Sequence, residues 1–292
     1  MPIQDESSVG DARESAALNK VEACLRGASV MPLSDVRFLE SHDCFEGAST
    51  QRAQILTWFA DRTYRRPPLD LLSIGSGGGN LDLSVVQSLR ETHGTRRYTG
   101  VDPNPVECDR CRDLMKGVGP GFEAMVLAAS FDDAELPSAA HDLVYAVQTL
   151  YYLGDVPAAL ARAVELLRPQ GELVVFQAPR GKLNRLSALS WELLLHRSID
   201  FSEDLLPLLK PYDSDVSRIE AWLDVTPCLG EGSDVGAIEL RDFILQVDSS
   251  RLDAMCVVAI DEYLTAIGRR DEQGRWWVPH PVDAHVVRRV AA

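Results

Sequence analysis

The chain has 292 residues, of which 46% are hydrophobic and 25% are charged, and its formal net charge is −15. A chain of this size and composition can bury one large core, or one core and a smaller second part. The negative charge argues against a nucleic-acid substrate, because phosphate backbones are bound by clustered Lys and Arg. An acidic surface of this kind keeps a protein soluble and favours cationic small molecules.

Neither a membrane span nor a signal peptide is expected. No stretch reaches the roughly 18 consecutive apolar residues of a membrane helix, and the first twelve residues are polar and acidic. We therefore expect a cytoplasmic protein. Cys108 and Cys111 form a C-x-x-C pair, but no further ligands follow at zinc-site spacing, so no metal is expected. The six cysteines do not indicate a disulfide framework: Cys24, Cys44, Cys108, Cys111, Cys228 and Cys256.

The N-terminal part of the chain is predicted to be helical. Residues 1–33 are rich in Ser, Ala and Glu, which predicts a flexible leader or a loosely packed helix. From Ser34 to Arg65 apolar residues recur at helical spacing, and Pro67 and Pro68 end the pattern. The side chains expected to face the core are Ile55, Leu56, Trp58 and Phe59.

The most distinctive segment runs from Asp70 to Leu83, where an apolar stretch gives way to four glycines within five residues. We expect a buried strand, a glycine turn and a helix that begins near Asn80. Gly75, Gly77 and Gly79 lack a Cβ where the chain turns, so a ligand can lie against the backbone there, and the helix directs N–H groups toward it. Nucleotide-like cofactors bind at such a turn after the first strand of a parallel sheet.

A second predicted strand, residues 97–102, ends in an acid. Asp102 lies about 20 residues after the last glycine, the spacing at which a carboxylate binds a ribose. A turn that binds a nicotinamide cofactor would have a glycine at position 80, and Asn80 there disfavours an oxidoreductase. The glycines instead resemble the S-adenosylmethionine (SAM) loop of class I methyltransferases.

Strands and helices alternate as far as Phe176. Helical spacing covers residues 81–89, 106–115 and 156–167, and strands are predicted at 140–147 and, after a Pro-Gln-Gly turn, up to residue 176. These last two elements also resemble class I methyltransferases. The predicted domains are a core over 34–179, a helix-rich cap over 180–270 and a C-terminal strand over 271–292 that forms an antiparallel edge of the core sheet.

Residues 147–160, V-Q-T-L-Y-Y-L-G-D-V-P-A-A-L, closely resemble the stretch after the fourth strand of histamine N-methyltransferases. Ser73, two residues before Gly75, also matches that family, since most class I methyltransferases have an acid there. The resemblance covers roughly residues 37–287 and is thin over 180–225. It implies a Rossmann-like α/β class I methyltransferase fold, with a mostly parallel seven-stranded sheet flanked by helices and an α-rich substrate-binding cap. It also implies SAM as cofactor and S-adenosylhomocysteine as product.

The resemblance assigns cofactor contacts position by position. Asp102 stands where the family has Glu and keeps the same chemistry at shorter reach, because a carboxylate accepts both ribose hydroxyls. Glu107 stands where the family has Gln and is equally compatible with an exposed helix charge. Ser130 is expected near the adenine. The full set of expected SAM contacts is Gly75, Ser76, Gly77, Gly79, Asp102, Glu107, Ser130, Phe131 and Val147.

The resemblance also assigns an acceptor pocket. Gln51 falls where the family has a Glu that binds the substrate, and His280 falls where it has an Asn. Glu46, which aligns only loosely with the family, is a residue that could compensate for the missing Glu. Losing that Glu removes a charge partner, so the acceptor need not be histamine. A tyrosine pair can hold a methylated cation. The expected acceptor contacts are Glu46, Gln51, Gln148, Tyr151, Tyr152, Phe243 and His280.

Gln148 and His280 are the predicted catalytic residues. Both would orient the acceptor, and His280 could also accept its proton. His280 lies between two prolines and is equally compatible with a surface-loop histidine that has no role.

The predicted function is methyl transfer from SAM to a nitrogen of a small molecule, namely an amine, imidazole or guanidine. An in-line displacement of this kind depends on positioning and needs no metal. Two alternatives remain open, a small-molecule O-methyltransferase and a non-catalytic SAM-binding protein, because a fold does not dictate a function.

Overall fold

The computed structural model describes residues 6–32, 36–64, 68–229 and 235–289, with side chains from residue 13 onward. The chain forms two compact units. Unit 1 comprises Met1–Gln51, Arg180–Ile199 and Glu220–Pro281, and unit 2 comprises Arg52–Pro179, Asp200–Ile219 and Val282–Ala292. These boundaries differ from the predicted ones, because each unit is assembled from three separate stretches of the chain.

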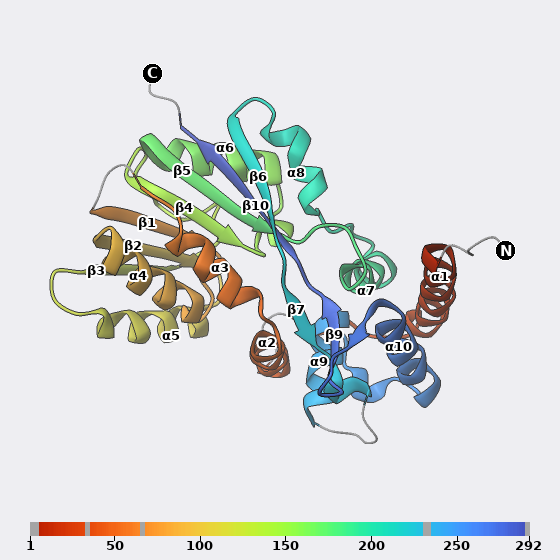
Figure 1. Cartoon of the computed structure of the whole chain (residues 1–292). Coiled ribbons are helices and arrows are strands. Elements are labelled where there is room, and N and C mark those ends of the chain that lie inside the picture. The colour runs from red at the N-terminus through yellow and green to blue at the C-terminus, as the bar shows by residue number, and fades with distance from the viewer. Residues whose placement is uncertain (1–5, 33–35, 65–67, 230–234, 290–292) are drawn as a thin grey trace. The chain divides into compact units, whose positions relative to one another are not determined.

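Unit 2 is built around a seven-stranded sheet with the order β3-β2-β1-β4-β5-β10-β6 (Figure 1). The first five strands are parallel, and β10 is antiparallel to both of its neighbours. The predicted Rossmann-like fold is therefore confirmed. The strands are β1 Leu69–Ile74, β2 Thr95–Asp102, β3 Glu123–Ala128, β4 His141–Val147, β5 Leu167–Gln177, β6 Asp213–Ile219 and β10 Val282–Arg288.

One strand of this sheet corrects the sequence analysis. The C-terminal strand β10 is antiparallel as predicted, but it lies between β5 and β6 rather than at the edge. The edge strand β6 comes from residues assigned to the cap. Its sequence, D-S-D-V-S-R-I, is mostly exposed and has one buried position, so it carries no apolar strand pattern.

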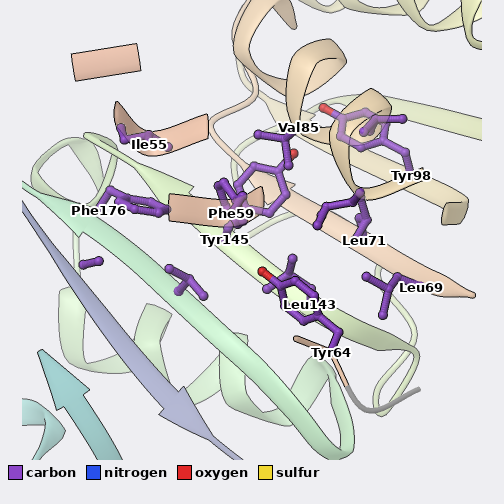
Figure 2. Packing of buried hydrophobic residues seen from close by; sticks show 14 of the residues in the cluster. Ile55, Phe59, Tyr64, Leu69, Leu71, Val85, Tyr98, Leu143, Tyr145 and Phe176 are labelled. Atoms are coloured by element: carbon purple, nitrogen blue, oxygen red, sulfur yellow. The ribbon is translucent and has the colours of Figure 1, made fainter. Parts of the chain in front are cut away.

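Helices cover both faces of the sheet, whose strands β1 and β4 are buried along their length. Leu71 and Leu72 illustrate the alternation of side chains, since they belong to different core clusters. Figure 2 shows Phe59, Tyr145 and Phe176 packed together on one side. The helices of the sheet unit are α3 Gln51–Ala60, α4 Asn80–Thr92, α5 Pro105–Met115, α6 Val156–Leu166 and α8 Ser202–Leu209, with short 3-10 turns η1 Lys116–Val118 and η2 Leu150–Tyr152.

Unit 1 is mainly helical and has its own core. Its helices are α1 Glu6–Leu25, α2 Val36–Ala48, α7 Asn184–Ser190, α9 Val235–Leu245 and α10 Ala254–Ile267, with the π-helical segment η3 Trp191–Leu195 and the short 3-10 turns η4 Thr226–Leu229 and η5 Ser249–Arg251. A small antiparallel sheet has the order β7-β9-β8, formed by β7 Trp222–Asp224, β9 Trp276–Pro279 and β8 Arg269–Arg270.

The region predicted as a leader contains helix α1, and residues 1–5 and 33 of that region lie outside the described residues. Ala17, Val21 and Leu25 are buried in the unit 1 core, where α1 packs on α10. Their spacing of four residues places them on one face of the helix. Over the described stretches of the chain, no helix combines the length and apolarity of a membrane span.

Candidate active site

The glycine turn follows β1 directly and lies in unit 2. The backbone N–H groups of Gly75 and Ser76 both donate to the carbonyl of Val101 on β2, at 2.8 and 3.1 Å. Gly75 has a φ of +72°, and a Cβ there would overlap the side chain of Thr149. Gly77 has a φ of +50°, and no atom lies within 4 Å of the place of its Cβ. Gly75 is therefore required by packing, whereas Gly77 presents bare backbone to open space, where a ligand can lie.

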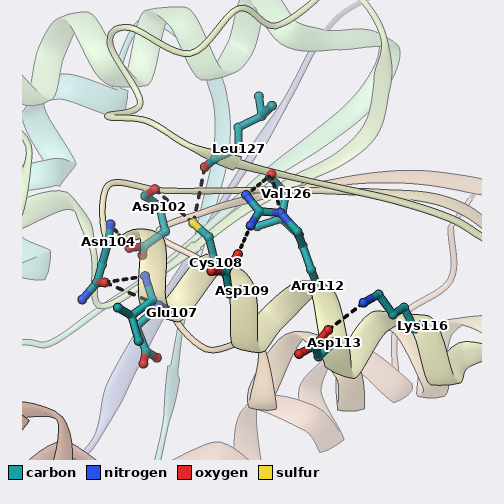
Figure 3. Close-up of polar contacts among 11 residues, drawn as sticks. Asp102, Asn104, Glu107, Cys108, Asp109, Arg112, Asp113, Lys116, Val126 and Leu127 are labelled. Atoms are coloured by element: carbon teal, nitrogen blue, oxygen red, sulfur yellow. Dashed lines mark hydrogen bonds and ion pairs between the residues drawn. The ribbon is translucent and has the colours of Figure 1, made fainter.

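Asp102, at the end of β2, is held in place by two backbone amides. Its Oδ2 accepts from the N–H of Gly77 at 2.9 Å, and its Oδ1 accepts from the N–H of Asn104 at 2.9 Å. Asn104 in turn caps helix α5, as Figure 3 shows. Each carboxylate oxygen offers more than one acceptor position, so Asp102 can still accept hydrogen bonds from two hydroxyl groups. The arrangement fits a ribose that lies beside the glycine turn.

Glu107 lies against the same turn, on α5. A Cβ on Gly78 would lie 2.6 Å from its Oε2, and the residue is 9% exposed. Arg110 donates to Oε1 of Glu107 at 3.1 Å, and its guanidinium carbon lies 3.4 Å from the same Cβ position. Glu107 is therefore not a solvated helix charge. Arg110 was missed by the sequence reasoning, although the i, i+3 spacing of the two residues indicates a pair on one helix face.

Three other predicted cofactor residues have side chains that are buried or that form a hydrogen bond within the protein. Ser76 is buried, with its hydroxyl next to Gly100. Phe131 is buried in a core cluster, beneath the guanidinium of Arg162. Ser130 donates to Asp133 at 2.7 Å. Contacts from Ser76 and Phe131 to a cofactor would therefore come from their backbone.

The segment after β4 places three predicted acceptor residues together. Val147 ends the strand, and Gln148 follows with a φ of +51°, a conformation rare for a residue with a side chain. The Gln148 N–H donates to Phe176 at 2.8 Å, and its Oε1 accepts from the N–H of Ala178 at 3.1 Å. Tyr151 and Tyr152 form the next turn, and their rings lie 4.6 Å apart.

His280 is buried in unit 1 and is not a surface-loop histidine. It is 6% exposed, and burial lowers its pKa to about 4, so its ring is neutral near pH 7. The hydroxyl of Ser49 lies 2.9 Å from Nδ1, and Nε2 of Gln51 lies 3.3 Å from the ring Nε2. Gln51 also donates to the His280 carbonyl at 3.1 Å. Both ring nitrogens therefore have partners within the protein, which argues against His280 as a proton acceptor in this arrangement.

The remaining acceptor candidates lie near His280 in unit 1. They include Phe243, whose ring packs with those of Phe45 and His42 in a group that we call the Phe243 cluster. The ring of Phe243 lies 4.5 Å from Phe45 and 5.2 Å from His42, and Phe45 meets His280 edge-on at 5.0 Å. Glu46 lies 3.9 Å from His42, one helical turn earlier. The structure thus groups the predicted acceptor residues in two sets, with Gln148 and the tyrosines in unit 2 and the others in unit 1.

Among the described residues, no group of three or more His, Cys, Asp or Glu side chains could hold a metal ion. The thiol of Cys108 donates to the carbonyl of Asp102 at 3.3 Å, and both cysteines of the C-x-x-C pair are free and buried. They belong to the core beneath the glycine turn.

Comparison with known proteins agrees with this geometry. Residues 72–175 match the model of a methyltransferase domain family. Histamine N-methyltransferase B of Xenopus laevis is 24% identical over 214 residues, which cover 65% of this chain and 70% of that protein. Histamine N-methyltransferase of Xenopus tropicalis is 24% identical over 159 residues, which cover 48% of this chain and 54% of that protein.

Solved structures share the fold at low sequence identity. The YcgJ protein of Bacillus subtilis has a TM-score of 0.54 at 12% identity, covering 81% of this chain and 98% of that one. A geranyl diphosphate methyltransferase in complex with SAM has a TM-score of 0.50 at 16% identity, covering 82% and 85%.

The sheet order, the glycine turn with Asp102 and the match of residues 72–175 to a methyltransferase domain indicate a class I SAM-dependent methyltransferase, with SAM as its cofactor. Within that class the chain resembles histamine N-methyltransferase.

Proposed function

We propose that this enzyme transfers the methyl group of SAM to a nitrogen atom of a small-molecule acceptor. One observation carries the proposal: the loop with Gln148, Tyr151 and Tyr152 packs on the cofactor turn, because the side chain of Thr149 lies where a Cβ of Gly75 would be. The choice of nitrogen is supported by the two Xenopus relatives, which are named histamine N-methyltransferases.

The protein's part in this reaction is to position the reactants and exclude water. SAM supplies, when bound, a methyl group on a positively charged sulfur that is already activated toward an amine. Asp102, fixed by its two backbone partners, accepts hydrogen bonds from the ribose hydroxyls. Gly77 offers backbone without a side chain at the turn, and Glu107 and Ser130 contact the rest of the cofactor.

Gln148 orients the acceptor in this proposal. Its Oε1 accepts from the N–H of Ala178, which fixes the plane of the amide. Tyr151 and Tyr152 offer ring faces to a cationic or newly methylated nitrogen. The net charge of −15 favours such an acceptor.

The acceptor roles of Glu46, Gln51, Phe243 and His280 rest on the resemblance. Gln51 donates to His280, so this pair recognises a polar group by hydrogen bonding rather than by charge. We propose that His280 holds Gln51 in place, and that Glu46 is the acidic group of the Phe243 cluster.

The test compares Gln148→Ala with Gln170→Ala in a methyl-transfer assay on a panel of histamine, histidine, arginine, other small amines and phenols. Gln170 is a matched control, because it is an exposed glutamine with a φ of +69°. We expect an N-methylated product, and a loss of kcat/KM for the acceptor in Gln148→Ala alone, with SAM affinity retained. Methylation of phenols only, or equal loss in both variants, would contradict the proposal.

A further inference from the structure

A buried polar cluster in unit 2 has no part in the cofactor site. Its buried members are Ser202 at the start of α8 and Asp283 and His285 on β10, and the exposed Arg218 of β6 pairs with Asp283. Ser202 is 2% exposed, Asp283 5% and His285 1%. Groups of this kind are costly to bury unless their hydrogen bonds are made, so the cluster requires a physical explanation.

The hydrogen bonds of the cluster determine which of its atoms carry a proton. The Ser202 hydroxyl lies 2.6 Å from Oδ2 of Asp283 and 2.8 Å from Nε2 of His285. Arg218 donates to both carboxylate oxygens of Asp283, at 2.8 and 3.0 Å. Burial opposes the charged form of Asp283, but the hydrogen bonds from Arg218 and Ser202 outweigh it and lower the pKa of this carboxyl. Asp283 is therefore a carboxylate and accepts the single hydroxyl proton of Ser202.

His285 then has to donate to Ser202. Burial lowers the pKa of His285, partly offset by Asp283 and Glu203, so the ring is neutral near pH 7. Since the Ser202 proton points to Asp283, the ring proton must be on Nε2. Serine, histidine and aspartate are also the residues of a hydrolytic triad, but here the serine bonds to both others and is buried, so it cannot act as a nucleophile on a substrate.

The cluster is connected to Gln148 by two hydrogen bonds through one peptide segment. The N–H of Ser202 donates to the carbonyl of Ala178 at 2.8 Å, and the N–H of Ala178 donates to Oε1 of Gln148 at 3.1 Å. The side chain of Gln177 donates to the carbonyl of Asp200, which ties the same two segments together again. The end of β5 therefore has a fixed position on α8, and it holds the amide of a residue with an unusual backbone conformation.

We propose that Ser202, fixed by Asp283, is a positioning residue that sets the orientation of the Gln148 amide toward the methyl acceptor. The inference rests on the proposed acceptor role of Gln148. The hydroxyl of Ser202 anchors the start of α8 to β10, the Ser202 N–H anchors the 177–178 segment, and that segment anchors Gln148. Removing the hydroxyl breaks the bond between the start of α8 and β10. The position of Gln148 then loses a support that lies far from it in the sequence.

A double-mutant cycle tests the proposal. Ser202→Ala, Gln148→Ala and the double variant are compared with Ser190→Ala, a buried serine of unit 1 whose hydroxyl bonds only within its own helix, to Leu186. We expect Ser202→Ala to lower kcat/KM for the acceptor about tenfold in the wild-type background and less than about twofold in the Gln148→Ala background, with SAM affinity unchanged. Ser190→Ala should leave kcat/KM unchanged.

A merely structural role of Ser202 predicts the same loss in both backgrounds, and that result would overturn the inference. A Gln148→Ala variant with full activity would refute the proposed role of Gln148, and the inference with it. If only hydroxyl acceptors are methylated, the proposed function fails on nitrogen, but the cycle run with that acceptor still decides the inference.

A second measurement needs no turnover. Hydrogen–deuterium exchange of the peptide that covers residues 173–180 should be faster in Ser202→Ala than in wild type or Ser190→Ala, because the start of α8, whose Ser202 N–H holds the Ala178 carbonyl, loses its hydroxyl bond to β10. Unchanged exchange would overturn the inference.

Discussion

Asp102→Asn is the substitution that should weaken SAM binding most selectively. The two oxygens of Asp102 accept from Gly77 and Asn104, both at 2.9 Å. An asparagine keeps the shape of the side chain but replaces one oxygen with an NH₂ group. Whichever oxygen is replaced, a donor then faces a backbone donor, and the negative charge that receives the ribose hydroxyls is gone.

The expected magnitude follows from the bonds lost. A hydrogen bond to a charged group contributes about 1.5–3 kcal/mol, and each 1.4 kcal/mol is about tenfold in affinity. Loss of one such bond to the cofactor raises the Kd for SAM by about 10- to 100-fold. The Kd for S-adenosylhomocysteine should rise by a similar factor, because both molecules carry the same ribose.

Isothermal calorimetry with SAM and S-adenosylhomocysteine measures both values. Asp109→Asn is the matched control, since Asp109 lies on α5, the helix that follows Asp102 in the chain, has a 74% exposed side chain and pairs with Arg112. Its Kd should equal that of the wild type. A Kd for Asp102→Asn within about twofold of the wild type would refute the assignment of the ribose to this carboxylate.

Three further predictions concern the rest of the fold. Gly75→Ala should lower the free energy of unfolding, measured by urea titration, by about 1–3 kcal/mol, because φ is +72° and the Cβ overlaps a side chain. Gly117→Ala, with open space around it, should have little effect, and equal effects of the two substitutions would contradict the packing argument. Burial lowers the pKa of His141 and of His280 to about 4, so the unfolded chain binds more protons than the folded one between pH 6.5 and 4. The free energy of unfolding should have its full value above pH 6.5 and fall by about 3 kcal/mol per histidine as the pH drops to 4. A free energy of unfolding that does not change over that range would be inconsistent with neutral buried rings. Gln51→Glu places a carboxylate where an amide now lies 3.3 Å from the ring of His280, so the pKa of His280 should rise, as measured by NMR titration, and an unchanged value would show that the two side chains do not interact.

The sheet core could be predicted from the sequence because its signals are local. The apolar stretch before Gly75, the glycine turn and the acid at Asp102 predicted β1, α4 and β2 within a few residues of their observed bounds. The same holds for β4, α6 and β5, which have strong apolar patterns and a Pro-Gln-Gly turn. Apolar stretches bordered by turn-forming residues indicate where an element begins and ends.

Edge strand β6 and the composition of the two units could not be predicted in this way. Six of the seven residues of Asp213–Ile219 are polar or exposed, and their pairing with β10 joins residues far apart in the sequence. Unit 1 likewise combines α1 with α10, from opposite ends of the chain. Such pairings depend on tertiary contacts, which a one-dimensional pattern does not contain.

The candidate site shows the same difference between local signals and tertiary contacts. The glycine turn and the acid beside it were predicted from spacing, because the backbone next to these residues sets where they lie. The burial of His280 was not foreseen, since a histidine between two prolines has the sequence pattern of a surface loop, and its environment comes from Ser49 and Gln51. Ser202 gave no signal either, because its partners lie on β10.

The most direct test of the central claim is a single-turnover reaction with SAM labelled by ¹³C in its methyl group, followed by NMR and mass spectrometry of the products. We expect one ¹³C-methyl bound to nitrogen of a small acceptor for each S-adenosylhomocysteine formed. Tight SAM binding with the label recovered only on oxygen, or with no transfer to any acceptor of the panel, would contradict it.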